Sequence, residues 1–260
     1  MGISLKNRVV WITGASSGIG AATARMLAER GAIPVLTARS SDKLREVSAQ
    51  IQGEHSAWVL DVTDARQAEE SASRIYERYG RLDILLNNAG YGEFIPFADA
   101  DLAHFQEMMD VNYFGVIRCT KAALPYMLKA KEGHIVNVAS LAGKIGTPKA
   151  SGYAATKHAV IGLTESLRQE LAPYGILVSA VNPGPVATPF FDRADPQGSY
   201  LRNLGSFVLK PEQVARAIIR VMEKRSKETD MPWSLAAGAW IRRAFPRLTD
   251  ALAARLLDKK

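Results

Sequence analysis

Short runs of β-branched and apolar residues alternate with longer stretches of helical periodicity along most of this chain. Strands separated by helix-length connections pair in parallel, and the helices cover both faces of the resulting sheet. No internal repeat or low-complexity linker divides the pattern. It predicts one α/β domain with a doubly wound parallel sheet. The expected strands are 9–13, 34–37, 57–60, 83–86, 134–139 and 177–181, and the main expected helices after the first are 65–79, 102–130, 153–171 and 211–224.

Composition excludes several classes of protein. Cys119 is the single cysteine, so a disulfide-stapled secreted scaffold is excluded. No apolar run reaches the roughly 18 residues of a membrane-spanning helix, and the N-terminus lacks an apolar signal stretch, so we expect a cytoplasmic protein. The four histidines share no ligand spacing, and no metal site is predicted.

The net charge of +7 is unevenly distributed. Residues 232–260 hold six basic and two acidic side chains, a net of +4, which leaves +3 for the remainder. This modest remainder disfavours nucleic acid as a partner.

The first strand runs directly into the glycine-rich turn 14–20 and then into a helix. In a doubly wound sheet, ligands bind beyond the carboxyl ends of the strands. Glycines let backbone amides approach a pyrophosphate, and the helix N-terminus adds donors and positive potential. The spacing is GxxxGxG rather than GxGxxG, and the alternative is a turn that holds no ligand. The cofactor-binding candidates here are Gly14, Ser16, Ser17, Gly18 and Ile19.

The end of the second strand indicates which dinucleotide binds. An acidic residue there would accept hydrogen bonds from the ribose 2′-hydroxyl of NAD(H). This chain has Ala38 at that position and Arg39 next to it. A guanidinium without an adjacent carboxylate can hold a 2′-phosphate, so we expect NADP(H) rather than NAD(H). The alternative is a solvated arginine at a strand end.

Tyr153 and Lys157 are four residues apart on one face of a predicted helix, and Ser140 ends the strand 134–139 at the same edge of the sheet. Reducing a carbonyl with hydride requires a proton donor for the developing alkoxide. A tyrosine can donate at neutral pH only if its pKa falls from about 10. A lysine ammonium about 4 Å away in a partly desolvated pocket provides roughly the 4 kcal/mol needed. Ser140 would donate to the substrate oxygen.

The assembled motifs resemble those of the short-chain dehydrogenase/reductase family, in its compact single-domain branch. The resemblance extends to about residue 225. It rests on 13–20, Asp61-Val62, Asn87 to Gly90, Asn112, Ser140, Tyr153, Lys157 and 183–188.

The resemblance implies a Rossmann-like fold and an NADP(H)-dependent enzyme that interconverts an alcohol and a ketone or aldehyde. Tyr153 would be the acid in reduction and the base in oxidation, and Asn112 would hold a water that links Lys157 to solvent. Lys157 would also bind the nicotinamide ribose. The remaining implied cofactor contacts are Asp61 and Val62 beside the adenine, Asn88, Ala89 and Gly90 on the adenosine side, and Val186 and Thr188 at the carboxamide. Pro183 and Gly184 are further implied cofactor-binding residues.

Some of these residues have structural alternatives. Asp61 could serve only as a helix N-cap, and Asn87 is better explained as a tie between neighbouring strands than as a ligand contact. A non-catalytic NADPH-sensing or scaffold protein that retained the fold is the main functional alternative, although such a protein needs no proton donor.

Family members commonly associate through the helices that contain Asn112 and Tyr153, so a homodimer or homotetramer is expected.

The segment 189–210 corresponds to the family's variable substrate lid, and its aromatic and apolar residues predict an apolar carbonyl substrate. The alternative is that they only pack the lid on the core. Neighbouring loops add Ile145 and the apolar surface of 91–97. The lid residues are Phe190, Phe191, Tyr200, Leu201, Leu204 and Phe207.

We divide the chain into a catalytic domain at 1–231 and an amphipathic basic extension at 232–260. Leu248, Leu252 and Leu256 share one helical stripe in the extension, close to Trp233 and Trp240. One interpretation is a helix that docks on its own or a partner subunit. The other is peripheral contact with an anionic membrane.

Overall fold

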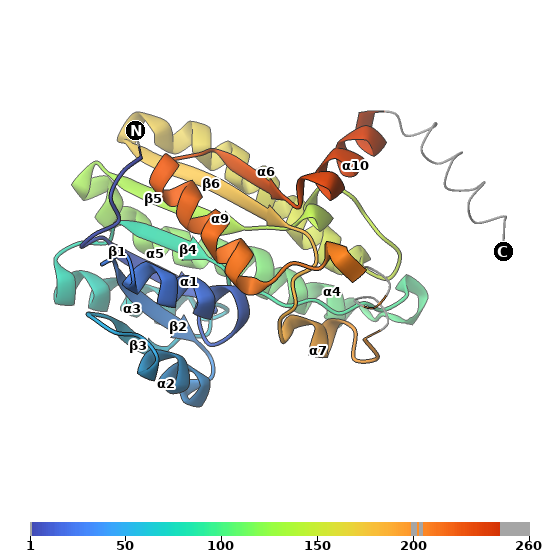
Figure 1. Ribbon diagram of the computed structural model, residues 1–260, viewed down its shortest axis with the longest axis horizontal. Coiled ribbons are helices and arrows are strands. Elements are labelled where there is room, and N and C mark those ends of the chain that lie inside the picture. The colour runs from blue at the N-terminus through green and yellow to red at the C-terminus, as the bar shows by residue number, and fades with distance from the viewer. Residues whose placement is uncertain (1, 199–201, 203–204, 245–260) are drawn as a thin grey trace.

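The computed structural model describes residues 2–198, 202 and 205–244 (Figure 1). Within these residues seven parallel strands form one sheet in the order β3-β2-β1-β4-β5-β6-β7. This architecture confirms the predicted fold class. The strands are β1 (Val9–Thr13), β2 (Ile33–Ala38), β3 (Ser56–Val59), β4 (Ile84–Asn87), β5 (Gly133–Val138), β6 (Ile176–Pro183) and β7 (Glu228–Met231).

Helices cover both faces of the sheet (Figure 1). One apolar core lies under α1, α2 and α9, and the other lies under α3, α5 and α6. The short helix α7 and the C-terminal helix α10 lie beyond the carboxyl ends of the central strands (Figure 1). The helices are α1 (Gly18–Ala28), α2 (Ser41–Ala49), α3 (Ala65–Tyr79), α4 (Leu102–Met109), α5 (Gly115–Ala130), α6 (Ser151–Leu171), α7 (Phe190–Ala194), α9 (Pro211–Lys224) and α10 (Trp233–Ala244).

β1 illustrates why these sequences form a central parallel sheet. All five of its residues are buried. Val10 and Ile12 belong to the core under α1 and α9, whereas Val9 and Trp11 belong to the opposite core. Successive side chains of a strand point to opposite faces, so a strand covered on both sides must be apolar throughout.

The chain order reverses between β1 and β4, which are neighbours in the sheet. At such a switch point the connections leave in opposite directions and open a crevice at the carboxyl ends of the strands. Many of the candidate site residues identified from the sequence follow β1, β4, β5 and β6 at this edge.

The predicted helix over 102–130 is present, but it is not a regular α-helix throughout. The backbone forms a π-helical turn at Asp110–Phe114, between α4 and α5. A π-turn inserts one residue into the helix and often marks a functional site. Asn112 lies in the middle of this turn.

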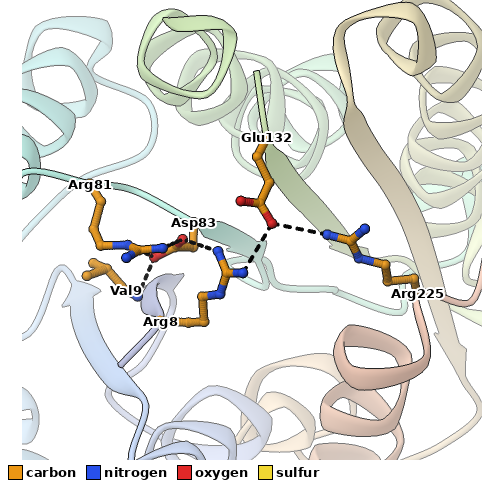
Figure 2. Close-up of polar contacts among 6 residues, drawn as sticks. All are labelled: Arg8, Val9, Arg81, Asp83, Glu132 and Arg225. Carbon is orange, nitrogen blue, oxygen red and sulfur yellow. Dashed lines mark hydrogen bonds and ion pairs between the residues drawn. The ribbon is translucent and has the colours of Figure 1, made fainter. Parts of the chain in front are cut away.

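The opposite, amino-terminal edge of the sheet is held by an ion-pair network (Figure 2). Arg8 donates to Asp83 at 2.8 Å and to Glu132 at 3.1 Å, and Glu132 also pairs with Arg225 at 3.2 Å. Burial alone would raise the pKa of the Asp83 carboxyl, but hydrogen bonds from Arg81, Arg8 and the backbone outweigh it and keep this pKa below its usual value. The network fastens β1, β4 and β5 together where no candidate site residue lies.

The described part of the chain contains no helix long and apolar enough to cross a membrane. It also contains no cluster of three or more potential metal-ligating side chains.

Candidate active site

The glycine-rich turn after β1 is tied to the loop that follows β4. Thr13 Oγ1 accepts hydrogen bonds from the backbone N–H groups of Asn88 at 3.0 Å and Ala89 at 3.1 Å. The Asn88 side chain donates in return to the carbonyl oxygens of Thr13 and Gly14, each at 3.0 Å. Gly14 has a φ of +67°, and a Cβ atom there would lie 2.8 Å from Ala89 Cα, so glycine is required. Two predicted cofactor segments therefore meet at the switch point.

Helix α1 begins at this turn with open backbone donors. Ser17 is the N-cap residue, and among the described residues no side chain caps this end. The first turn also contains no acidic residue. A Cβ atom on Gly20 would lie 2.4 Å from the carbonyl oxygen of Gly14, which shows how tightly the turn closes. This arrangement suits an anionic group such as a pyrophosphate.

Arg39 is exposed directly after β2, whereas the preceding Ala38 is buried. In the described part of the chain Arg39 forms no ion pair, while the nearby Asp42 pairs with Arg45. The Ala15 N–H donates to the carbonyl oxygen of Thr37, which places the end of β2 beside the glycine-rich turn. The guanidinium of Arg39 is therefore available at the edge where the sequence predicts a 2′-phosphate.

The alternative that Asp61 is a helix N-cap is wrong. Asp64 caps α3 by accepting hydrogen bonds from the N–H groups of Arg66 and Gln67. Asp61 instead accepts from the N–H and hydroxyl of Thr63, at 2.9 and 2.8 Å. Its neighbour Val62 is buried. Adenine contact by this pair stays a prediction.

Asn87 ties strands together, as expected. Its Nδ2 donates to Asn137 Oδ1 on β5 at 2.9 Å and to Thr120 Oγ1 on α5 at 3.2 Å. Asn137 in turn donates to Thr164 on α6 at 2.8 Å. This buried chain of polar groups fixes the position of α5 and α6 relative to the sheet.

A cavity of about 420 Å³ lies at the carboxyl edge of β5 and β6, and Ser140, Tyr153 and Lys157 all line it. Ile19 and Asn88 line its other side. The structure thus brings the three predicted catalytic side chains into one space with the glycine-rich turn. From the end of β6 and the following loop, Pro183, Gly184, Pro185, Val186 and Thr188 also line the cavity.

Lys157 is buried below Tyr153. Its Nζ donates to the carbonyl oxygen of Val138 at 3.0 Å and lies 5.7 Å from the centre of the Tyr153 ring. Burial lowers the pKa of this ammonium to about 8, because its charge is removed from water. A cation at this distance in a largely buried site favours the phenolate form of a tyrosine.

The hydroxyl of Ser140 is oriented by two backbone groups. Its Oγ accepts a hydrogen bond from the Ala142 N–H at 3.0 Å and donates to the carbonyl oxygen of Pro183 at 3.2 Å. These contacts hold the oxygen at the cavity wall, between the end of β5 and the end of β6.

Asn112 links the π-turn to the neighbouring loop and helix. Its Oδ1 accepts from the Tyr91 N–H at 2.9 Å, and its Nδ2 donates to the Tyr91 carbonyl oxygen at 2.8 Å and to Thr156 Oγ1 at 3.1 Å. A Cβ atom on Gly90 would lie 2.9 Å from Asn112 Oδ1. The sequence did not identify Thr156. The water-holding role of Asn112 stays a prediction.

Aromatic rings surround Tyr153 on the lid side. The Phe190 ring centre lies 5.3 Å from that of Tyr153, and Phe94 lies 6.3 Å from it. Phe191 packs on Phe190 at 5.1 Å. Phe94 comes from the loop after β4, within the segment 91–97 that was expected to add apolar surface to the pocket, and it lines the cavity.

The other residues predicted to form the substrate pocket do not all line the cavity. Ile145 lines the cavity as predicted, whereas Phe207 is 43% exposed and does not. Phe207 lies in the short helical turn Gly205–Phe207 on the surface. This turn precedes Leu209, which pairs with Val186. Tyr200, Leu201 and Leu204 lie outside the described residues.

Sequence reasoning also missed one wall of the cavity. Ser234, Leu235 and Gly238, all on α10, line it. The first part of the extension is therefore placed against the chain's own cavity. Leu248, Leu252 and Leu256 of the expected stripe lie outside the described residues.

A family model described as short chain dehydrogenase matches residues 8–198. The chain belongs to the short-chain dehydrogenase/reductase family. A curated relative, the 3-oxoacyl-[acyl-carrier-protein] reductase of Thermotoga maritima, is 37% identical over 227 residues, which cover 83% of this chain and 90% of the relative.

Solved structures of the same family superpose closely. A short-chain dehydrogenase/reductase from Burkholderia phymatum in complex with NAD has a TM-score of 0.88 at 26% identity, covering 95% of this chain and 96% of that one. A metagenomic short-chain oxidoreductase in complex with NADP has a TM-score of 0.74 at 32% identity, covering 88% and 97%. This chain is accordingly an oxidoreductase of a family that binds a nicotinamide cofactor, and these two neighbours contain both forms of it.

The residues of this short-chain dehydrogenase/reductase fit such a cofactor. The glycine-rich turn packs so closely on Ala89 that Gly14 cannot carry a Cβ atom, and the N-terminus of α1 in this turn has no side-chain cap, so its backbone N–H groups can bind an anionic group. From there the cavity continues past Ile19 to Tyr153 and Lys157. A dinucleotide bound at the turn would have its nicotinamide end on the side of the predicted catalytic residues.

Proposed function

We propose that this protein is an NADP(H)-dependent oxidoreductase that interconverts an alcohol and a ketone or aldehyde, with an apolar carbonyl compound as substrate. The observation that supports this most directly is the meeting of Ser140, Tyr153 and Lys157 in one cavity beside the glycine-rich turn. A sensing or scaffold role would require no proton donor at this position.

In the proposed mechanism the bound nicotinamide supplies or accepts the hydride. Tyr153 gives its phenolic proton to the carbonyl oxygen during reduction and takes a proton from the alcohol during oxidation. The Ser140 hydroxyl turns from the Pro183 carbonyl oxygen and donates to the same substrate oxygen, while its Oγ keeps the hydrogen bond from the Ala142 N–H.

Lys157 stabilises the negative charge that forms on Tyr153. Its ammonium is buried, so little water screens it, and at neutral pH a pKa of about 8 leaves it mostly charged. Asn112 positions the loop beside this lysine through its bonds to Tyr91 and Thr156. We propose that a water held near Asn112 returns the proton to Lys157 and Tyr153.

We assign the cofactor preference to Arg39. Its exposed guanidinium directly follows β2, with the small side chain of Ala38 where an acidic residue would favour NAD(H). A bidentate contact with a 2′-phosphate is the interaction that arginine makes best.

Apolar side chains support the substrate class. Phe94, Phe190, Phe191 and Ile145 line the cavity around Tyr153. Such walls bind hydrocarbon surface and offer few partners to a charged or hydroxyl-rich substrate.

Two further proposals concern partners. Phe97, Leu102 and Phe114 are 74, 71 and 46% exposed near α4, which supports association of two copies of the chain along the helices that contain Asn112 and Tyr153. Trp233 is 80% exposed on α10, which is consistent with peripheral membrane contact. Sedimentation of the full chain, alone and with anionic vesicles, tests both.

Thermal unfolding with saturating NADPH, and separately with NADH, tests the cofactor site. At a hundredfold excess over the dissociation constant, binding adds roughly 2.7 kcal/mol, or roughly 5–10 °C for a domain of this size. We expect this shift with NADPH and a much smaller one with NADH. The Tyr153→Phe variant should keep the shift and lose aldehyde reduction. Equal turnover by the variant would disprove the assigned proton donor.

A further inference from the structure

The first helix of the extension, α10, is attached directly to the sheet. β7 pairs with β6, and the Gly184 N–H donates to the carbonyl oxygen of Met231 at 2.6 Å. α10 begins two residues later, at Trp233, and the Ala236 N–H bonds to the Pro232 carbonyl oxygen at 3.2 Å. The start of the helix is therefore fixed at the end of β6, where the cavity lies.

Half-buried polar contacts hold β7 in place. Lys144, which follows the turn after Ser140, pairs with Glu228 at 2.6 Å and with Asp230 at 2.7 Å. Asn182 on β6 donates to the same two carboxylates, each at 2.7 Å. These bonds link the Ser140 turn, β6 and β7, and so they also set the distance between the predicted catalytic residues and α10.

One side of α10 faces the cavity. Ser234 and Gly238 are separated by one helical turn, Leu235 lies next to Ser234, and all three line the cavity. The Leu235 Cδ1 atom would lie 3.3 Å from a Cβ atom on Gly184, so this leucine packs against the loop after β6. Leu235 is half-buried, whereas Ser234 and Gly238 are exposed and so lie at the mouth of the cavity. Trp233 is 80% exposed and does not line the cavity.

Gly238 is exposed and leaves space at the mouth of the cavity. A Cβ atom built on it would meet no atom within 4 Å, although the residue lines the cavity. In the middle of a helix glycine is less favourable than most residues. A larger side chain here would project into open space without displacing a described neighbour.

We propose that α10 forms the distal wall of the substrate site and that Leu235 and Gly238 determine how long an apolar substrate can be. The substrate is then a carbonyl compound whose apolar tail extends from Tyr153, past the ring of Phe190, towards α10. This proposal rests on the proposed function for the position of the carbonyl group. It assigns to the extension a role in substrate selection.

Two substitutions at Gly238 test the wall. Gly238→Leu adds bulk to the open space, and Gly238→Ala is the matched control that removes the glycine while adding a single methyl group. Both new residues favour a helix over glycine, so α10 is retained in each variant. Turnover of butanal and of decanal with NADPH reports on the accepted length, and calorimetry of decanol binding with saturating reduced cofactor reports on the cavity without turnover.

We expect Gly238→Leu to lower kcat/KM for decanal roughly tenfold or more, and to weaken decanol binding similarly, because one or two misplaced methyl groups in an apolar pocket cost about this much. Butanal turnover should change much less than decanal turnover, and the loss for decanal in Gly238→Ala should be smaller than in Gly238→Leu. Unchanged decanal preference and decanol binding in Gly238→Leu would overturn the proposal, as would failure of the wild type to bind decanol. If decanol binding weakens as expected but no aldehyde is reduced, the wall is supported and the proposed function fails.

Discussion

At the residue scale, burial gives Lys157 a charge that depends on pH near 8. The lysine lies under Tyr153 with Nζ bonded to the Val138 carbonyl oxygen, and loss of solvation lowers its pKa to about 8. The ammonium form predominates below that pH. Deprotonation above it removes the positive charge that would stabilise the Tyr153 phenolate.

Carbonyl reduction should therefore decline as pH rises through about 8. The Lys157→Met variant should lose at least roughly a hundredfold in kcat/KM, within the range of general acid–base effects, and should lose this part of the pH profile. Initial rates between neutral and alkaline pH, with cofactor binding measured in parallel, check the prediction. A variant that retains the alkaline decline would show that another group titrates.

Arg39 provides a second test at the same scale. Replacing it with alanine removes a charge-assisted contact worth roughly 1.5–3 kcal/mol, so NADPH should bind about ten to a hundred times more weakly. NADH binding should hardly change. Dissociation constants for both cofactors measure the effect.

Arg45→Ala is the matched control. Arg45 is exposed on α2 and paired with Asp42, close to Arg39 in the sequence. A similar loss of NADPH affinity in this variant would indicate a general charge effect rather than a specific contact.

At the scale of elements, α7 is fastened to the loop after β4. Arg193 pairs with Glu93 and stacks 3.8 Å from the centre of the Tyr91 ring. The Phe94 N–H also donates to the Ala194 carbonyl oxygen at 3.1 Å. These bonds keep the lid aromatic rings beside Tyr153.

Arg193→Ala should loosen this connection. We expect KM for an apolar aldehyde to rise several-fold, with a smaller change in kcat and none in cofactor affinity, because the ring cluster binds substrate rather than nucleotide. Glu93→Ala should have a similar effect, and the double variant should add little if the pair acts together. Steady-state kinetics of the three variants decides this.

At the scale of the whole molecule, His134 links pH to stability. It is buried on β5, and its Nε2 lies 2.8 Å from Ser179 Oγ, which itself donates to the Ser226 carbonyl oxygen. Nδ1 has no hydrogen-bond partner among the described residues. Burial lowers the pKa of this imidazole to about 4.

The unfolded chain binds a proton at His134 near pH 6.5, whereas the folded protein resists it until about pH 4. The contribution to the free energy of unfolding is thus complete above pH 6.5 and is lost as the pH falls towards 4, by up to roughly 3 kcal/mol. Urea unfolding of the wild type and His134→Gln over this range should give a shallower pH dependence for the variant. Parallel curves would contradict the assignment.

The amino-acid sequence by itself determined the alternation of elements and the local motifs. The strand 9–13 and the helix 211–224 match their expected bounds, because residue periodicity and proline at a helix start act over a few positions. The Tyr153–Lys157 pair shares a helix face for the same local reason. Parallel pairing then placed Ser140 and the glycine-rich turn at one edge of the sheet.

Tertiary structure alone decided which distant segments meet. The π-turn at Asp110–Phe114 contains Asn112, whose hydrogen bonds go to Tyr91 and Thr156 on other elements. Phe94 reaches Tyr153, and α10 closes one side of the cavity, through packing between residues far apart in the chain. Such contacts depend on how whole elements pack around the switch point between β1 and β4. The residue pattern within a single segment does not predict that packing.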